Sequence, residues 1–136
     1  MVVQQKGKNI IIVEDDDFLR GLLLHNMHDA GFNVKAASDA ESAFTHLQTH
    51  NPDLILLDLV LPGMNGFDFL TELKDKRKLQ VPVIVLSKWG SQDDVDLAMS
   101  RGANYFMIKA NVTPKQIIDK ALSVLWKNDK ESCYEK

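Results

Sequence analysis

The sequence predicts an α/β fold in which a five-stranded parallel sheet carries helices on both faces. Four short apolar runs, at residues 10–13, 54–57, 83–86 and 105–108, are continuous rather than alternating, which is typical of strands buried on both faces of a parallel sheet. A fifth run, at residues 33–37, mixes polar and apolar positions and indicates an edge strand. Helical patterns lie between and after these runs. Because parallel neighbours need crossover connections, this alternation favours a parallel sheet.

The first two helices are predicted from an apolar stripe and a signal at one end. The stripe of the first is followed by Gly31, at a position where a helix C-terminus favours a left-handed residue. The second is preceded by Ser38, with Glu41 three residues later, which is a capping-box pattern. The apolar positions are Leu19, Leu22, Leu23, Met27 and Ala30 in the first helix, and Ala40, Ala43, Phe44 and Leu47 in the second. Each stripe predicts a helix that packs one face on the sheet.

The other three helices follow polar capping residues. Asn65 precedes the third helix, and Ser91 opens the fourth. The fifth has the fullest signal, because Thr113 stands at the cap, Pro114 at the first helical position and Gln116 at the third. We therefore expect one helix after each of the five strands.

Length and composition predict one compact domain. The chain has 136 residues, of which 45% are hydrophobic and 26% charged, close to the average of globular proteins. We expect residues 9–128 to form the domain, with tails at residues 1–8 and 129–136. The net charge of −3 argues against a nucleic-acid binder, which needs a basic surface.

Several other classes of protein are excluded by what the sequence lacks. Cys133 is the single cysteine, so it has no internal disulfide partner, and we expect a cytoplasmic location. No apolar run approaches the ~20 residues of a membrane span, and the first residues lack a signal peptide's apolar stretch. The pairs His25 with His28 and His46 with His50 are spaced like metal ligands. No cysteine or glutamate motif surrounds them, so we expect them on solvated helix faces.

Polar side chains stand at the carboxyl ends of the predicted strands, where ligands bind in open α/β sheets. Glu14 and Asp15 follow the first strand, and Asp58 follows the third. Ser87 follows the fourth strand, and Lys109 follows the fifth. Because these ends meet at one edge of a parallel sheet, we expect the five side chains to converge.

These residue types indicate a Mg²⁺-dependent site that accepts a phosphoryl group. Crowded carboxylates repel one another, and Mg²⁺ binds one or two carboxylates together with waters and phosphate oxygens. Asp15 and Asp58 suit that role. Lys109 suits the charge of a phosphoryl group and Ser87 a hydrogen bond to it. A carboxylate can itself be the nucleophile, which gives an aspartyl phosphate.

Four motifs occur in a fixed order, each at a strand end. They are residues 11–16 (IIVEDD) with Arg20, residues 57–66 (LDLVLPGMNG), residues 83–87 (VIVLS) and residues 102–109 (GANYFMIK). In this combination the chain resembles a response-regulator receiver domain, the phospho-acceptor module of two-component signalling. The resemblance runs from about Asn9 to Asn128. Each motif alone is weak, but all four in order are specific.

The resemblance implies a doubly wound, flavodoxin-like sheet in the order 2-1-3-4-5 and a set of functional roles. Asp58 would be phosphorylated by a histidine kinase or a histidine phosphotransfer protein. Mg²⁺ would be ligated by Asp15, Asp58 and the backbone carbonyl of Val60, with Glu14 acting through a water molecule. Such a domain catalyses its own phosphorylation and slow dephosphorylation and is not otherwise an enzyme. Its fourth helix, fifth strand and fifth helix would control a protein partner, without direct contact to nucleic acid or membrane.

The resemblance also implies a switch, and the sequence departs from the family pattern beside it. Ser87 would be the switch hydroxyl, Lys109 the cation of the acidic site, and Phe106 the aromatic residue whose rotamer follows Ser87. Lys88 stands where receivers usually have a small residue. Ala110 replaces the usual proline after the lysine, and since a cis bond there would cost ~3 kcal/mol, we expect a trans bond or an adjusted loop.

Two other interpretations stay open. Asp15, Asp16 and Asp17 after an apolar strand also resemble the D-x-D opening of haloacid-dehalogenase-type phosphatases, in which Asp15 would be the nucleophile and Asp58 would have no role. A pseudo-receiver would bind partners without phosphorylation. The residue that becomes phosphorylated separates the three. Whichever of the three interpretations holds, we interpret Asp16 and Asp17 as capping residues of the first helix.

Overall fold

Five parallel strands form a single sheet in the computed structural model of the chain, which describes residues 7–134 and the side chains of residues 7–126. The strands are β1 (Asn9–Val13), β2 (Asn33–Ala37), β3 (Leu54–Asp58), β4 (Val83–Ser87) and β5 (Tyr105–Ile108). Their order across the sheet is β2-β1-β3-β4-β5, so β2 and β5 are the edges. The predicted strand order and the predicted edge position of β2 are confirmed.

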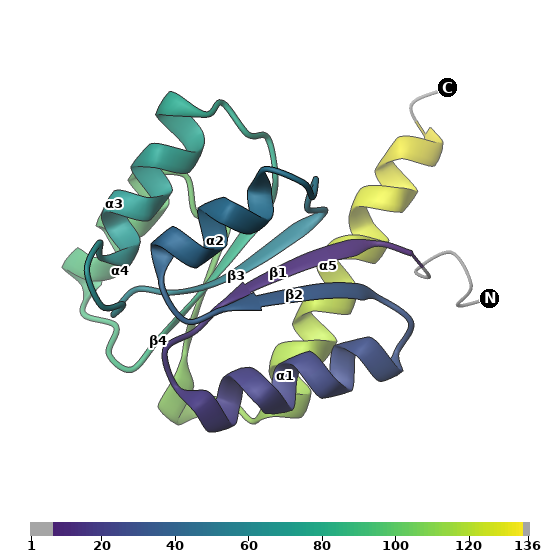
Figure 1. Cartoon of the computed structure of the whole chain (residues 1–136), viewed down its shortest axis with the longest axis horizontal. Coiled ribbons are helices and arrows are strands. Elements are labelled where there is room, and N and C mark those ends of the chain that lie inside the picture. The colour runs from purple at the N-terminus through teal and green to yellow at the C-terminus, as the bar shows by residue number, and fades with distance from the viewer. Residues whose placement is uncertain (1–6, 135–136) are drawn as a thin grey trace.

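Helices cover both faces of the sheet (Figure 1). Two helices pack on one face and three on the other. The pair is α1 (Asp17–Asp29) and α5 (Pro114–Tyr134); the three are α2 (Ala40–Leu47), α3 (Gly66–Thr71) and α4 (Gln92–Ser100). A π-helical turn, Glu72–Lys76, continues α3, and a 3-10 turn, Lys109–Asn111, follows β5. This is the doubly wound α/β fold that the sequence predicts.

The sheet separates two apolar clusters, which explains why its central strands read as continuous apolar runs. In β1, Ile10 and Ile12 face the cluster made with α1 and α5. Ile11 and Val13 face the opposite cluster, made with α2, α3 and α4. Because successive side chains of a strand point to opposite faces, a strand covered on both sides needs apolar residues at every position.

Most of the predicted helix ends are confirmed by hydrogen bonds. Thr113 Oγ1 accepts from the Gln116 N–H at 3.1 Å, and Gln116 Oε1 accepts from the Thr113 N–H at 2.8 Å. Asn65 and Ser91 likewise accept from the backbone N–H three residues further on. After α1, Gly31 adopts a φ of 101°, the left-handed conformation that glycine allows without strain.

The start of α2 differs from the prediction. Asp39, and not Ser38, is the capping residue, and its Oδ1 accepts from the Ser42 N–H at 2.8 Å. The physical reason is that an ionised carboxylate is favoured at the positive end of a helix as an acceptor for the free N–H groups. Asp16 has the same position at α1, where its Oδ1 accepts from the Leu19 N–H at 2.9 Å. The interpretation of Asp16 as a capping residue is thus confirmed.

The expected tails at residues 1–8 and 129–136 lie only partly within the described residues. Residues 1–6 and 135–136, and the side chain of Cys133, lie outside the described residues. Helix α5 continues past Asn128 to Tyr134, since no glycine or proline interrupts residues 115–134. At the other end, the Asn33 N–H donates to the carbonyl of Lys8 at 2.9 Å.

Two further properties concern the backbone between residues 7 and 134. No helix in that range is long and apolar enough to cross a membrane. No peptide bond in it is cis, in agreement with the trans bond expected between Lys109 and Ala110. The 3-10 turn at Lys109–Asn111 leads the chain from β5 toward α5.

Candidate functional site

Three charged side chains from the carboxyl ends of different strands meet at one point. Glu14 follows β1, Asp58 ends β3 and Lys109 follows β5. The Lys109 ammonium lies 2.9 Å from the Glu14 carboxylate and 3.1 Å from Asp58 Oδ2. Only 1% of the Glu14 side chain and 6% of the Asp58 side chain are exposed, against 16% for Lys109. The parallel sheet therefore brings together residues that are far apart in the sequence.

Backbone groups hold the two buried carboxylates in place. Asp58 Oδ1 accepts from the Val60 N–H at 3.0 Å, so the carboxylate is fixed by the loop that follows it. Glu14 Oε2 accepts from the Asp16 N–H at 3.0 Å and also from Lys109. Each carboxylate has one neighbour in its own loop and shares Lys109 with the other. Their geometry is thus set both locally and across the sheet.

A cavity of about 230 Å³ opens over these side chains. It is lined by four acidic residues, two lysines and two apolar residues. They are Glu14, Asp15, Asp16, Asp58, Lys88, Lys109, Val60 and Trp89. Asp15 is exposed at this cavity, whereas Asp58 lies at its buried end. The cavity is large enough for a phosphoryl group with a metal ion and water, since a water molecule occupies about 30 Å³.

Burial and charge shift the protonation of this cluster. Burial raises the pKa of Glu14 from 4.5 to about 7; hydrogen bonds from Lys109 and the Asp16 N–H oppose this shift, and the charge of Asp58 reinforces it. Burial lowers the pKa of Lys109, but the hydrogen bonds and charges of Glu14 and Asp58 outweigh it, so that this pKa is raised overall. Lys109 is therefore a stable cation, and its single positive charge is shared by two carboxylates.

The donor set fits a divalent cation. Glu14 Oε1 is buried and lies 2.9 Å from the Lys109 ammonium, but it accepts no well-aligned hydrogen bond from the described residues. It can therefore still accept a hydrogen bond from a water molecule, including one bound to a metal ion. Within the described part of the chain, no three His, Cys, Asp or Glu side chains are gathered as a metal cage. Mg²⁺ can use as few as one or two carboxylates, since it completes its octahedron with waters and carbonyl or phosphate oxygens.

Most of the chain resembles a known protein family. Residues 10–122 match the family described as "Response regulator receiver domain". The chain belongs to this family. Membership confirms the receiver resemblance inferred from the four sequence motifs, and it links the domain to two-component signalling.

Relatives of this receiver domain include transcriptional regulators. The alkaline phosphatase synthesis transcriptional regulatory protein PhoP of Bacillus subtilis is 30% identical over 123 residues, which cover 90% of this chain and 50% of PhoP. The DNA-binding response regulator MtrA of Mycobacterium tuberculosis is 33% identical over 124 residues, which cover 91% of this chain and 53% of MtrA. The receiver domain therefore spans about half the length of these curated relatives.

Solved structures share the fold of this receiver domain. A CheY-like response regulator receiver domain protein from Methanospirillum hungatei superposes with a TM-score of 0.83 at 24% identity, over 93% of this chain and 99% of that one. A chain of the CheX-CheY-BeF3-Mg²⁺ complex from Borrelia burgdorferi gives a TM-score of 0.77 at 28% identity, over 88% of this chain and 90% of that one. Both are consistent with the observed strand order.

In this receiver domain, Ser87 and Phe106 do not line the cavity. The Ser87 hydroxyl donates to the Trp89 carbonyl at 2.6 Å and lies 3.3 Å from the Trp89 N–H. Phe106 is half-buried against the α2–α4 cluster. Gly90, in the loop that carries Ser87, lies against β5: a Cβ at Gly90 would lie 3.2 Å from the Phe106 ring and 2.7 Å from the side chain of Ile108. The loop after β4 thus lies directly on β5.

One positioning residue was not given a role by the sequence analysis. Arg20 in the receiver's α1 donates to the carbonyls of Glu14 at 3.0 Å and Asp15 at 3.3 Å, and it pairs with Asp17 at 2.7 Å. It therefore clamps the acidic loop after β1. Its position one helical turn after that loop was the available signal. Asp17 lies in the first turn of α1 and pairs with Arg20, so the interpretation of Asp17 as a capping residue is wrong.

The exposure of the histidines agrees only in part with the prediction that they lie on solvated helix faces. His25 is exposed and lies 3.2 Å from Asp29, as expected for a solvated face. His46 and His50 are half-buried instead. His46 Nε2 lies 3.2 Å from the Ala36 carbonyl, and the rings of His46 and His50 are 6.4 Å apart. His46 lies on α2, which packs beside the sheet edge at β2, and His50 follows the end of this helix.

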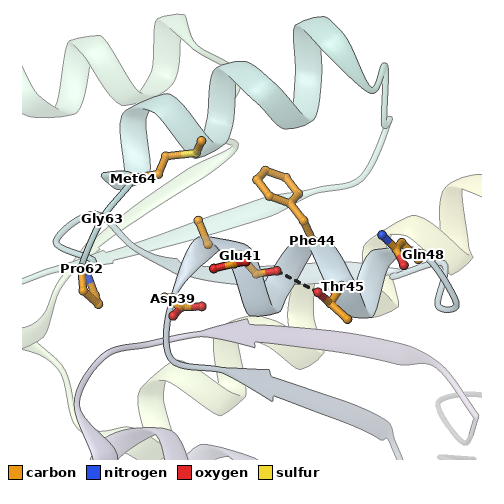
Figure 2. Close-up of a pocket in the computed structure, with 9 residues that line it drawn as sticks. Asp39, Glu41, Phe44, Thr45, Gln48, Pro62, Gly63 and Met64 are labelled. Carbon is orange, nitrogen blue, oxygen red and sulfur yellow. Dashed lines mark hydrogen bonds between the residues drawn. The ribbon is translucent and has the colours of Figure 1, made fainter.

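A second cavity of the receiver domain lies away from the carboxylates. It has a volume of about 660 Å³ and lies between α2 and the loop from β3 to α3 (Figure 2). Figure 2 shows Phe44 and Met64 at its apolar side, Glu41 on α2, and Asp39 at the position that caps this helix. None of the described residues that line it is a cation. Despite its greater volume, it lacks the groups that phosphoryl chemistry requires.

Proposed function

We propose that this receiver domain is a cytoplasmic phosphorylation switch in which Asp58 accepts a phosphoryl group from a histidine kinase or a histidine phosphotransfer protein. The observation that carries the proposal is the Lys109 ammonium, held 3.1 Å from Asp58 Oδ2 and 2.9 Å from the Glu14 carboxylate beside an open cavity. A cation in this position has a clear use when negative charge arrives at Asp58.

The transfer requires an oriented nucleophile and compensation of charge. An Asp58 carboxylate oxygen forms the new bond to phosphorus as the bond from phosphorus to the donor histidine nitrogen breaks, and that nitrogen keeps the electron pair. The Val60 N–H fixes the carboxylate through Oδ1. Lys109 pairs with the growing negative charge. Because both groups are already in position, little reorganisation is needed when the donor docks.

The acidic residues supply the site for Mg²⁺. Asp15, Asp58 and the Val60 carbonyl would hold the ion, and Glu14 would act through an intervening water molecule. When bound, the ion offsets charge on the phosphoryl oxygens. Glu14 Oε1 supports this assignment, because it lies 2.9 Å from Lys109 but accepts no well-aligned hydrogen bond from the described residues, and so can accept one from a metal-bound water.

Phosphorylation of Asp58 should reach a partner protein through the loop after β4 and through β5. For Ser87 to reach a phosphoryl group on Asp58, its hydroxyl must leave the Trp89 carbonyl that it contacts at 2.6 Å. The loop that carries Trp89 and Gly90 lies on Phe106, so movement of this loop alters the packing of β5. A protein partner that binds α4, β5 and α5 would sense that change.

The test is to map the modified residue. The full chain is incubated with Mg²⁺ and a small phosphodonor, and the acyl phosphate is trapped and located by mass spectrometry. We expect modification of Asp58, no modification of Asp58→Asn, and no reaction in EDTA. Modification of Asp15 would favour the phosphatase interpretation, and absence of any modification, including with histidine phosphotransfer proteins, would favour a pseudo-receiver.

A further inference from the structure

Lys88 is an unpaired cation at the mouth of the Asp58 cavity. It directly follows β4, its side chain is exposed, and it lines the same 230 Å³ cavity as Asp58 and Lys109. Lys109 is engaged with two carboxylates. Among the described residues that line this cavity, Lys88 is the cation that forms no ion pair. Its charge is therefore available to an anion that enters.

The loop after β4 holds Lys88 in this place. The Ser87 hydroxyl contacts both the carbonyl and the N–H of Trp89, which fixes the turn on either side of Lys88. The Lys88 ammonium lies 5.9 Å from the centre of the Trp89 ring.

A small phosphodonor meets unfavourable charge at this site. Four of the eight residues that line the cavity are acidic. An acyl phosphate carries two negative charges at neutral pH, whereas phosphoramidate is a zwitterion with a net charge of about −1. Repulsion between like charges rises with the product of the charges, so a free cation at the entrance favours the acyl phosphate more than phosphoramidate.

We propose, on the basis of the phosphoryl-acceptor function above, that Lys88 binds the phosphoryl oxygens of small, doubly negative acyl phosphates and makes this receiver selective for them as direct phosphodonors. In the reaction, an Asp58 carboxylate oxygen forms a bond to phosphorus. The bond from phosphorus to the acyl oxygen breaks, and the acyl carboxylate leaves with the electron pair. No proton, oxidant or reductant is consumed, and the total charge is conserved.

The experiment compares two donors on four proteins. Wild type, Lys88→Gln, Lys88→Arg and Lys35→Gln are each incubated with Mg²⁺ and either acetyl phosphate or phosphoramidate, and the rate of Asp58 modification is measured by intact mass. Lys35→Gln is the matched control, because it removes the same charge from an exposed position in β2, outside the lining of the cavity. Circular dichroism melts check that every variant is folded.

The ratio of the acetyl phosphate rate to the phosphoramidate rate decides the outcome. We expect Lys88→Gln to react with acetyl phosphate about tenfold more slowly, equivalent to about 1.4 kcal/mol. Its rate with phosphoramidate should fall by only about threefold, because half the charge on the donor halves the interaction energy. Lys88→Arg should retain most of the acetyl phosphate rate, and Lys35→Gln should match wild type. Added salt should slow the acetyl phosphate reaction of wild type more than that of Lys88→Gln.

The failure of this inference differs from the failure of the proposed function. If wild type reacts at Asp58 but Lys88→Gln keeps the ratio of the two rates, Lys88 does not select the donor and the inference is wrong. If both rates fall equally, Lys88 acts on the protein rather than on the donor, which also overturns it. If wild type is modified at another residue or by no donor, the phosphoryl-acceptor function itself is wrong.

Discussion

Lys109 Nζ lies 3.1 Å from Asp58 Oδ2 although the two residues are 51 positions apart in the chain. They meet because β3 and β5 run parallel on either side of β4, so their carboxyl ends lie at the same edge of the sheet. The same ammonium contacts Glu14, 95 positions away at the end of β1. One lysine thus joins three strand ends, and the stability and reactivity of the site both depend on it.

Mg²⁺ should stabilise the folded domain, and removal of one acidic charge should do so without the ion. At ten times its dissociation constant, Mg²⁺ should add roughly 1.4 kcal/mol to the free energy of unfolding. In EDTA, Asp58→Asn should be more stable than wild type, because Asp58 repels the buried Glu14 carboxylate, while Lys109 keeps Glu14 as its partner. A gain of about 1 kcal/mol would raise Tm by about 4 °C.

Thermal melts with and without Mg²⁺ measure both effects. Asp58→Asn should also respond less to Mg²⁺ than wild type does, since it lacks a ligand. A lower melting temperature for metal-free Asp58→Asn would show that the ion pair with Lys109 outweighs the repulsion from Glu14.

Lys109 and Ser87 should affect different steps. Lys109→Ala removes the cation beside Asp58, so both phosphoryl transfer and the resulting conformational change should weaken. Ser87→Ala should still be phosphorylated, because its hydroxyl contacts Trp89 and not Asp58 in the unmodified domain. The NMR shift changes in α4 and β5 after phosphorylation should then be smaller than in wild type. Lys115→Ala, an exposed lysine of α5, serves as the control for loss of charge. Shift changes of wild-type size in phosphorylated Ser87→Ala would refute the switch role.

The phosphorylated state should be comparatively long-lived. Val60 and Trp89 line the cavity through which water must approach phosphorus, and neither side chain can orient a water molecule for attack. Replacing Val60 with Asn and Trp89 with Ser should speed dephosphorylation by about tenfold, or about 1.4 kcal/mol of barrier. Loss of the phosphoryl group over time, followed by intact mass, measures this rate. Trp126→Ser, at the other exposed tryptophan, should leave the lifetime unchanged. An equal or longer lifetime in the double variant would contradict the shielding argument.

Two glycine-to-alanine substitutions should have opposite effects on stability. A Cβ at Gly66 would lie 2.5 Å from Leu59 Cα and 2.8 Å from the Asp58 carbonyl. These are backbone atoms that cannot move aside, so Gly66→Ala should cost roughly 1–3 kcal/mol and disturb the loop that positions Asp58. Gly21 in α1 has no atom within 4 Å of such a Cβ, and Gly21→Ala should stabilise the domain by about 0.5–1 kcal/mol. Urea unfolding of both variants measures the difference; equal effects of one sign would contradict the close approach at Gly66.

The sequence by itself determined the fold class and the candidate site residues, because both depend on local patterns. Continuous apolar runs such as residues 54–57 reflect strands covered on both faces, and the capping pair Thr113 and Gln116 marks a helix start through contacts three residues apart. The site residues stood at strand ends, and the topology of a parallel sheet places such ends together. The capping pattern indicated Ser38, whereas the neighbouring Asp39 caps α2 in the structure.

Only the tertiary structure decided how those residues are used. It shows that Lys109 is shared by Glu14 and Asp58, that Glu14 Oε1 is buried without a well-aligned hydrogen bond from the described residues, and that the Ser87 hydroxyl contacts Trp89. Each of these depends on distances between groups from separate elements and on the removal of water, which no spacing along the chain encodes. The pKa of Glu14 is raised to about 7 for the same reason, since burial arises only when the elements pack.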